Sequence, residues 1–172
     1  MKGHPCARAT ASNPAKRPKK PPSTQLLHVE DVDAGFLETL LGYNARRAAL
    51  TVIGQFLPRM AAFELRPVDF SVLSLITHNP GITSRQLCAA LGILPPNLVG
   101  MINALVRRGL IQRQPHPTDR RAVGLQLTAD GQALMKQAEV AASELEAQAA
   151  SRLTPAEHRT LLRLLRKVYH PE

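Results

Sequence analysis

The sequence predicts a mainly α-helical fold with one small β-hairpin, an α+β architecture within a single domain. Three observations predict it. Apolar residues recur at helical spacing over most of residues 31–172. Two short runs, residues 111–113 and 123–127, alternate apolar and polar residues as half-buried strands do. A chain of 172 residues is also long enough to bury a sizeable core in one domain.

A basic, proline-rich segment opens the chain. Residues 1–25 contain six Lys or Arg residues and no acidic residue, and they have too few apolar residues to offset the entropy of ordering. We therefore expect residues 1–28 to be a disordered basic tail and residues 29–172 to be the folded domain. Such a tail can attract DNA non-specifically, since neutralised phosphates release counterions. It can equally act only as a solubilising extension.

No run of apolar residues is long enough to span a bilayer, and the N-terminus lacks the apolar stretch of a secretory signal. The two cysteines, Cys6 and Cys88, do not indicate a disulfide framework. We therefore expect a cytoplasmic protein with no membrane partner.

The first predicted helix occupies about residues 31–65. Asp31 or Asp33 can cap its start, and Pro58 is expected to kink or end it near Leu57. A second helix begins at Pro67 and closes at residues 79–81. The apolar stripe of the first helix consists of Phe36, Leu37, Leu40, Leu41, Asn44, Ala48, Val52, Ile53 and Phe56. The inward side of the second helix carries Phe70, Leu73 and Ile76.

Two further helices follow, joined by a glycine turn. Thr83 and Gln86 have the spacing of a capping box, in which two side chains satisfy each other's free backbone amides. Gly92 ends this short helix, since glycine adopts positive φ without steric cost. Pro95 opens the next helix, which stops at Gly109. Its inward side carries Leu98, Met101, Ile102 and Leu105, and its outward side carries Pro96, Asn97, Gly100, Asn103, Ala104 and Arg107.

The hairpin formed by residues 111–113 and 123–127 has a polar, cationic tip, residues 116–121, with the sequence HPTDRR. Helix, turn, helix and then a hairpin with a cationic tip is the layout of a winged helix-turn-helix, here residues 66–128. The second helix of the pair suits the major groove of DNA, and the hairpin tip suits the minor groove.

The last two predicted helices are apolar over more of their circumference than one chain can cover. Thr128 can cap a helix that runs to about Ala150, and Thr154 with Glu157 forms a capping box for the final helix. Together with residues 31–65, residues 129–172 therefore leave apolar surface that a second copy would bury. We expect a homodimer whose two modules read an inverted-repeat operator in double-stranded DNA.

Positive charge is concentrated on the predicted DNA-binding module. The whole chain has a formal net charge of +9, and residues 66–128 contain seven Arg residues against Asp69 and Asp119. A clustered basic surface is the electrostatic footprint of a protein that binds nucleic acid.

Residues 105–131 carry a recognisable pattern. The run LVRRGLI at residues 105–111 precedes a hairpin pattern made of Asp119, Arg120, Arg121, Val123, Leu125, Leu127, Thr128 and Gly131. The pattern resembles the end of the recognition helix and the wing of the MarR family of bacterial transcriptional regulators. The resemblance extends from about residue 40 to the C-terminus. It implies a dimer built from the terminal helices that binds operator DNA, most commonly as a repressor.

The resemblance also implies particular DNA contacts. Arg121 matches the wing arginine that enters the minor groove, with Asp119 placed to orient its guanidinium and Arg120 free to meet a phosphate. Alternatively, Asp119 and Arg121 form only an exposed ion pair, which contributes roughly 0–1 kcal/mol. Ser84 and Arg85 begin the supporting helix, where backbone amides and a side chain can meet phosphate.

The recognition helix departs from the usual family pattern. Relatives often have Ser or Thr near its start and Arg in its middle, whereas this chain has Pro96, Asn97 and Gly100. Asn97 can read adenine through its amide, Asn103 is a further base contact, and Arg107 at the helix end suits a phosphate. An exposed helical glycine costs about 1 kcal/mol relative to alanine, so Gly100 suggests close approach of the backbone to the groove.

MarR proteins commonly respond to small aromatic or phenolic acids, so the resemblance implies an effector of this class, an aromatic carboxylate. An arginine would clamp the carboxylate and a tyrosine or histidine would meet a ring hydroxyl. The expected effector contacts are Tyr43, Asn44, Arg46, Arg47, Phe70 and His78. Alternatively, the two arginines face solvent or pair between helices, and His78 is a helix-end cation.

Two other functions stay open from the residues. A redox sensor would use Cys88 or Cys6, although Cys88 has the apolar neighbours of a small buried residue. A winged-helix adaptor would bind protein rather than specific DNA. The sequence contains no nucleotide-binding or hydrolase motif, and its six histidines show no ligand spacing. We therefore expect no enzyme activity, metal or cofactor.

Overall fold

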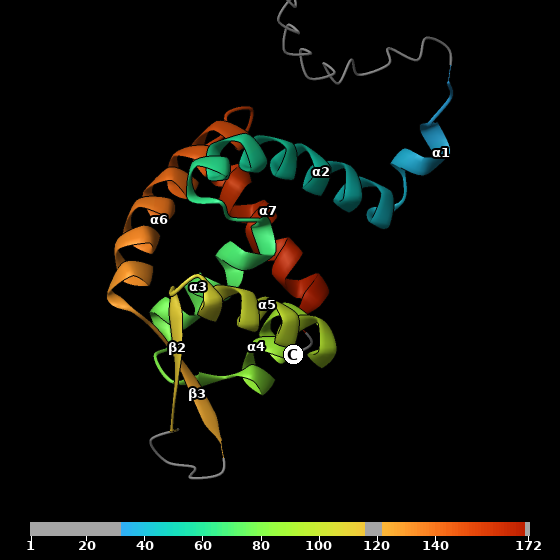
Figure 1. The fold of residues 1–172 in the computed structure, drawn as a ribbon. Coiled ribbons are helices and arrows are strands. Elements are labelled where there is room, and N and C mark those ends of the chain that lie inside the picture. Colours follow the sequence, from blue (N-terminus) through green and yellow to red (C-terminus); the bar gives the residue numbers. More distant parts are fainter. Residues whose placement is uncertain (1–31, 116–121, 171–172) are drawn as a thin grey trace, which may run out of the picture. The chain divides into compact units, whose positions relative to one another are not determined.

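The computed structural model describes residues 32–115 and 122–170. The unit Gly35–Glu172 carries every helix and strand of the described ranges (Figure 1), and the expected tail, residues 1–28, lies outside those ranges. The predicted fold class, mainly helical with a small antiparallel sheet, is confirmed. The elements are α1 (Gly35–Glu38), α2 (Leu41–Met60), η1 (Ala61–Phe63), α3 (Pro67–His78), β1 (Ile82–Thr83), α4 (Ser84–Leu91), α5 (Pro95–Arg107), β2 (Ile111–Pro115), β3 (Val123–Leu127), α6 (Ala129–Ala149) and α7 (Pro155–Tyr169).

The predicted first helix is broken in two. The apolar stripe predicted one continuous helix, but α1 ends at Glu38 and α2 begins at Leu41. The side chain of Asn44 stabilises the break, because its Nδ2 donates to the carbonyl oxygens of Glu38 at 2.7 Å and Leu40 at 2.9 Å. A periodicity argument cannot detect such a break, since the apolar spacing continues across it.

Pro58 does not end the helix where the sequence predicts. It lies inside α2, which continues to Met60 rather than closing near Leu57. In the last turn of a helix a proline removes one backbone hydrogen bond and leaves few later ones to disturb. The chain then tightens into the 3-10 turn η1.

The core lies between α3, α4, α5, the sheet and α6. The inward sides predicted for α3 and α5 are confirmed, with Met101 and Phe70 only partly buried. Phe70 packs edge-to-face against Phe56 of α2, with ring centroids 5.6 Å apart. The fully enclosed side chains of this core include Val72, Leu73, Ile76, Leu87, Leu98, Ile102, Leu105, Ile111, Leu125 and Met135.

The sheet has three strands rather than the predicted two, in the order β1-β3-β2, and all pairs are antiparallel. Two residues of β1 are too few to show alternation, which is why the sequence does not reveal this strand. Gly124 allows the backbone of β3 to approach the backbone at Gly81 closely, because a Cβ on residue 124 would lie 2.8 Å from the carbonyl oxygen of Gly81. The Gly81 N–H in turn donates to the Leu125 carbonyl at 2.8 Å.

The predicted caps of α4 and α7 are confirmed. Thr83 and Gln86 form a capping box on α4, and Gly92 ends that helix at φ 62°. Thr154 and Glu157 form the capping box on α7. Hydrogen bonds from the backbone N–H and the hydroxyl of Thr154 lower the pKa of Glu157, since they stabilise its carboxylate.

The junction of the helix-turn-helix with α6 is closely packed. The Thr128 hydroxyl donates to the Gly109 carbonyl and accepts from the N–H of Gly131 at 3.1 Å, so it caps α6 and ties it to the end of α5. The Thr128 N–H donates to the Leu110 carbonyl at 3.0 Å. A Cβ on Gly131 would lie 2.0 Å from that same carbonyl oxygen. Only glycine therefore fits here without movement of the backbone.

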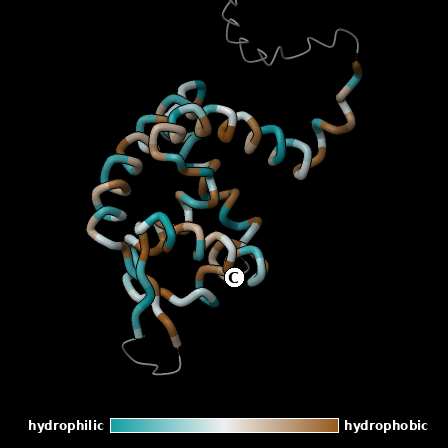
Figure 2. The backbone as a smooth tube through the Cα atoms, viewed as in Figure 1, coloured by the Kyte–Doolittle hydropathy of each residue, from teal (hydrophilic) through white to brown (hydrophobic). Residues whose placement is uncertain are grey.

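Apolar surface remains exposed on the helices that flank the module. Figure 2 shows hydrophobic positions recurring along α1 and α2. Phe36 is 76% exposed, and none of the 15 residues of α7 is buried. Between α2, α6 and α7 lies an apolar groove of about 510 Å³, lined by residues that include Val52, Leu161 and Leu165.

No single helix in the described ranges is long and apolar enough to cross a membrane. The pair α4 and α5 reaches that length and composition only when its two helices are joined across a bend of 116°. Their apolar side chains, among them Leu87, Leu98 and Leu105, belong to the core of the module.

Candidate nucleic-acid interface

The outward side of α5 is the exposed surface of the helix-turn-helix. Pro96, Asn97, Gly100 and Arg107 are exposed, as the helical spacing predicts. Asn103 differs, because it is only half-buried from solvent and its side chain is already bonded. Ser84 and Arg85 lie exposed at the first turn of α4, beside the Thr83 cap.

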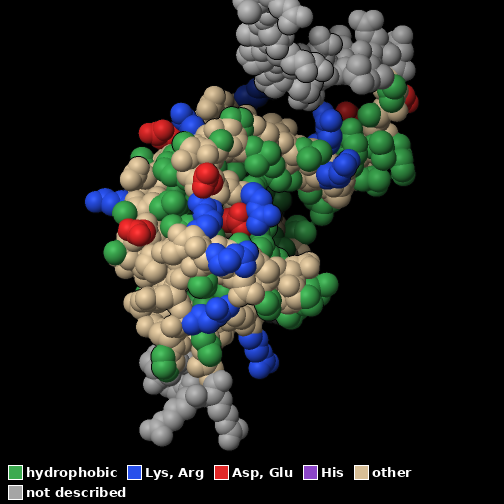
Figure 3. Space-filling view, in the orientation of Figure 1, with side chains coloured by type: hydrophobic (Ala, Val, Ile, Leu, Met, Phe, Trp, Pro, Cys, Tyr) green, Lys and Arg blue, Asp and Glu red, His purple; other side chains and the backbone are tan. Residues whose placement is uncertain are grey.

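The charge on this part of the chain has one sign. No acidic residue occurs between Asp69 and Asp119, whereas Arg85, Arg107 and Arg113 are exposed within that stretch. In Figure 3 the part of the described surface next to the hairpin carries Lys and Arg side chains. The acidic side chains in this view lie farther from the hairpin. A surface with this distribution attracts phosphate and is not neutralised by its own carboxylates.

The predicted wing contacts cannot be placed on this surface. Asp119, Arg120 and Arg121 lie outside the described residues. The described strands run up to them from both sides, with Pro115 opposite Val123 in the last register pair.

Two residues of the candidate interface were not predicted from the sequence. Val99 is apolar yet 52% exposed on α5, a position suited to a thymine methyl group. Arg113 on β2 donates through Nη2 to Oδ1 of Asn103 on α5 at 2.6 Å. Arg113 lies two residues after the buried Ile111, so its side chain belongs on the inner face of the strand.

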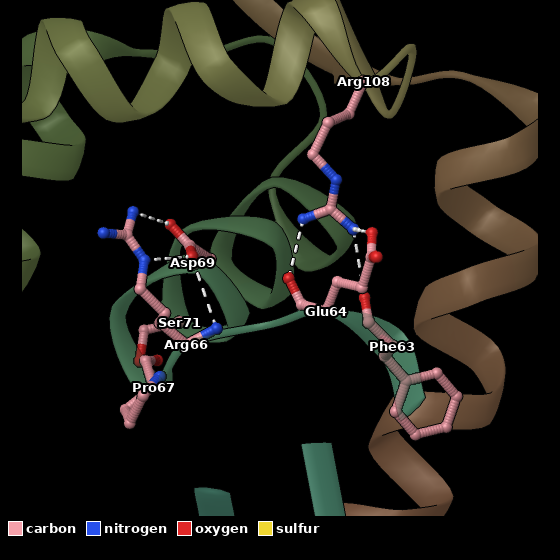
Figure 4. A network of polar contacts seen from close by, with 7 residues as sticks. All are labelled: Phe63, Glu64, Arg66, Pro67, Asp69, Ser71 and Arg108. Atoms are coloured by element: carbon pink, nitrogen blue, oxygen red, sulfur yellow. Dashed lines mark hydrogen bonds and ion pairs between the residues drawn. The ribbon is translucent and has the colours of Figure 1, made fainter. Parts of the chain in front are cut away.

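Arg108 fixes the end of α5 to the corner between α2 and α3 (Figure 4). Its guanidinium donates to the carbonyl oxygens of Glu64 at 2.8 Å and Phe63 at 3.0 Å, and it lies 3.7 Å from the Glu64 carboxylate. Glu64 has the left-handed φ of 52° at the turn where its carbonyl accepts from Arg108. The orientation of α5 is therefore tied to the segment that follows α2.

The same corner contains a second ion pair. Arg66 donates to the buried carboxylate of Asp69 at 2.7 and 3.0 Å, and the backbone N–H of Arg66 also donates to it at 3.3 Å. These contacts cap α3, and the hydrogen bond with Asp69 raises the pKa of Arg66. This pair is part of the scaffold, since the side chain of Asp69 is buried.

A small cavity lies where α2, α3 and α6 meet. It has a volume of about 180 Å³ and is lined by Val52, Phe56, Phe70, Ala142, Leu145 and Glu146. It shares Val52 and Glu146 with the larger groove beside α7. The Glu146 carboxylate lies 2.9 Å from Nε2 of His158. The cavity is thus apolar inside, with one carboxylate at its edge.

The six predicted effector residues are not all brought together. Phe70 lines the cavity, and Arg46 and Arg47 are exposed on the turn of α2 that also carries the groove residues Ala45 and Ala48. Tyr43 is half-buried one turn earlier.

Asn44 and His78 have other partners. The Nδ2 group of Asn44 donates to two backbone carbonyl oxygens at the break between α1 and α2. His78 lies 3.1 Å from Glu139 of α6, and Ser74 donates to the same carboxylate oxygen at 3.1 Å. His78 therefore joins α3 to α6. Phe56 and Glu146 were not predicted, because nothing in the sequence places α6 beside α2.

Comparisons with known proteins agree with one another on the family of the chain. Residues 63–122 match the profile of the MarR family. The chain is 31% identical over 133 residues to a Thauera aromatica protein described as a transcriptional regulatory protein for the hcr operon. This match covers 77% of this chain and 80% of the Thauera protein.

Two solved structures extend the comparison. The transcriptional repressor CouR bound to a 23-mer DNA duplex is 37% identical, with a TM-score of 0.75, and the match covers 82% of this chain and all of that one. CouR bound to p-coumaroyl-CoA is 35% identical, with a TM-score of 0.71, over 83% of this chain and all of that one.

Proposed function

Because the chain belongs to the MarR family of winged helix-turn-helix transcriptional regulators, we propose that it is a repressor that binds an inverted-repeat operator as a homodimer and is released by an aromatic acid or its thioester. The relatives are regulators rather than enzymes, which supports a non-enzymatic role. The observation that carries the proposal is the acid-free outward side of α5, exposed beside a basic wing strand.

DNA binding follows from this surface. α5 enters the major groove, where Asn97 and Val99 contact base edges and Arg107 contacts a phosphate. Ser84 and Arg85 hold a phosphate at the start of α4. The wing places Arg121 in the minor groove, with Asp119 orienting it and Arg120 on the flanking phosphate.

Dimerisation is supported by the exposed apolar surface of the flanking helices. Residues 31–65 and 129–172 supply that surface, and residues 66–128 form the DNA-binding module. A second copy covers the apolar residues of α1, α2 and α7, since monomeric proteins rarely leave contiguous apolar surface of this kind in water. Two modules related by a two-fold axis then fit two half-sites spaced by about one helical turn of DNA or a multiple.

The effector enters through the groove and places its ring in the cavity beside Phe56 and Phe70. The neighbouring CouR structure with p-coumaroyl-CoA supports an aromatic acyl group of this kind. Arg46 or Arg47, on the rim of the groove, meets the acid or the anionic end of a thioester. The Glu146 carboxylate, bonded to His158, accepts a hydrogen bond from a ring hydroxyl.

A ligand bound in the cavity can change the orientation of α5 through the contacts that join α2 to Arg108. Phe56 lies one helical turn before Met60, and the following η1 turn presents the carbonyls that Arg108 binds. Movement of α2 around a bound ring therefore shifts the anchor of α5. A ligand can change DNA affinity only by its differential affinity for the two arrangements, typically about 1–3 kcal/mol.

The redox alternative has less support. Cys88 is partly buried and packs against the core from α4. A thiol in this position behaves as a small apolar residue.

The effector test uses p-coumarate and p-coumaroyl-CoA as probes. A fluorescent duplex, selected by the protein from a randomised pool, is titrated with protein in the presence of each probe. We expect at least one probe to weaken binding about 5- to 150-fold, as a coupling of this size predicts.

The Phe70→Ala variant provides the matched control for that test. It should bind the duplex as the wild type does and lose the response, because Phe70 lines the cavity and not the DNA surface. A wild-type protein that binds DNA with no response to either probe would contradict the proposed effector class. DNA binding itself would be unaffected by that result.

A further inference from the structure

The side chain of Arg113 points toward the recognition helix. In the register of the hairpin, Arg113 lies opposite Leu125, which is 1% exposed, and two residues after the buried Ile111. Directly opposite residues share one face of an antiparallel sheet, as do residues two apart on a strand. Arg113 is thus a cation on the inner face of an edge strand, at the point where the wing leaves the core.

Its partner is Asn103. Arg113 Nη2 donates to Asn103 Oδ1 at 2.6 Å, a short, charge-assisted hydrogen bond. A guanidinium group has donors only. The amide of Asn103 must therefore turn its oxygen to the wing and its Nδ2 away from it. Arg113 fixes which end of the amide is available to a ligand.

Asn103 belongs to the outward side of α5. It lies three residues after Gly100 and four before Arg107, so at about 100° per residue these positions share one side of the helix. Arg113 already occupies one lone pair of Oδ1, so the end of the amide that Arg113 leaves fully available to a ligand is the Nδ2 group, which only donates. Reading adenine would require both ends of the amide, because adenine offers one donor and one acceptor in the major groove.

We propose that Arg113 and Asn103 act together as a donor-only contact, in which Arg113 is the positioning residue and Asn103 binds a hydrogen-bond acceptor on DNA. This inference rests on the proposed DNA-binding function. Two acceptors have the required chemistry: the O6 and N7 atoms of guanine, and a phosphate oxygen. The hydrogen bond from Arg113 disfavours adenine readout by Asn103, because that readout would also need Oδ1.

Two substitutions separate the roles. Asn103→Asp removes both amide donors and keeps an oxygen for Arg113. Arg113→Met keeps the aliphatic stem and frees the amide of Asn103 to turn. The two variants, the double variant and the wild type are compared by selection from randomised duplexes and by fluorescence anisotropy on the best wild-type duplex.

For Asn103→Asp we expect affinity to fall about 5- to 100-fold, because a base or phosphate acceptor then faces a carboxylate. If the acceptor is guanine, the loss is confined to duplexes with guanine at one position of each half-site, and Arg113→Met admits adenine there. If it is phosphate, the loss is equal on all duplexes. In either case the loss of affinity in the double variant should differ by at least about threefold from the product of the two single losses, since the residues are in contact.

Gln137→Glu is the matched control, because it adds the same charge at an exposed position of α6 and should change affinity less than twofold. Thermal unfolding of each variant establishes that it is folded. Wild-type affinity and sequence preference in Asn103→Asp would overturn the proposal, as would independent effects in the double variant. If the wild type itself binds no duplex, the proposed function fails instead.

Discussion

Replacing Gly131 with alanine is expected to lower the free energy of unfolding by about 3 kcal/mol. A Cβ at this position would lie 2.0 Å from the Leu110 carbonyl oxygen, so either α6 or the segment after α5 must move. Both groups are backbone, and overpacking of this kind costs about 1–3 kcal/mol or more. Moving α6 also breaks the hydrogen bonds through which Thr128 joins it to Gly109. Urea unfolding followed by circular dichroism measures the change.

Gly100→Ala is the control for this prediction. Nothing lies within 4 Å of a Cβ built at Gly100, and the residue is exposed in the middle of α5. Alanine there should stabilise the protein by about 1 kcal/mol and weaken DNA binding if the backbone approaches the groove closely. A Gly131→Ala protein as stable as the wild type would show that α6 is not tightly packed at its start.

Replacing Arg121 with alanine is expected to weaken operator binding by about 10- to 100-fold. The residue aligns with the minor-groove arginine that the family resemblance implies for the wing, and the proposed homodimer would present two of them. A narrow A·T-rich minor groove concentrates negative potential and favours an inserted arginine. The substitution should also relax sequence preference at the flanks of the site, which selection from randomised duplexes detects.

Arg85→Ala provides the contrast for Arg121→Ala. Arg85 is exposed at the start of α4 and is expected to meet phosphate, so its loss should be smaller and equal on all sequences. If Arg121→Ala instead weakens binding to operator and random DNA equally, the arginine does not lie in the minor groove.

The sequence predicted local structure correctly where a residue type has a specific role, such as capping or ending a helix. The capping boxes at Thr83 and Thr154 and the glycine that ends α4 all lie where their chemistry predicts. The apolar spacing of α5 identified its buried and outward sides, because a helix rotates each residue by a fixed angle. These features depend on neighbours within a few residues along the chain.

The features that the sequence did not reveal depend on contacts between distant segments. The strand β1 exists because β3 pairs with it, and Arg113 acquires its partner because the wing folds back on α5. The cavity proposed for the effector likewise combines Phe56, Phe70 and Glu146 from three helices. No periodicity along one segment encodes which residue of another segment will face it.

The salt dependence of binding to a selected inverted-repeat duplex tests the central claim most directly. Two copies that neutralise phosphates along both half-sites should give a logarithm of the association constant that falls steeply and linearly with the logarithm of salt concentration. The intact repeat should also bind more tightly than a duplex with one half-site scrambled. An affinity that is insensitive to salt, or equal for the two duplexes, would contradict the account.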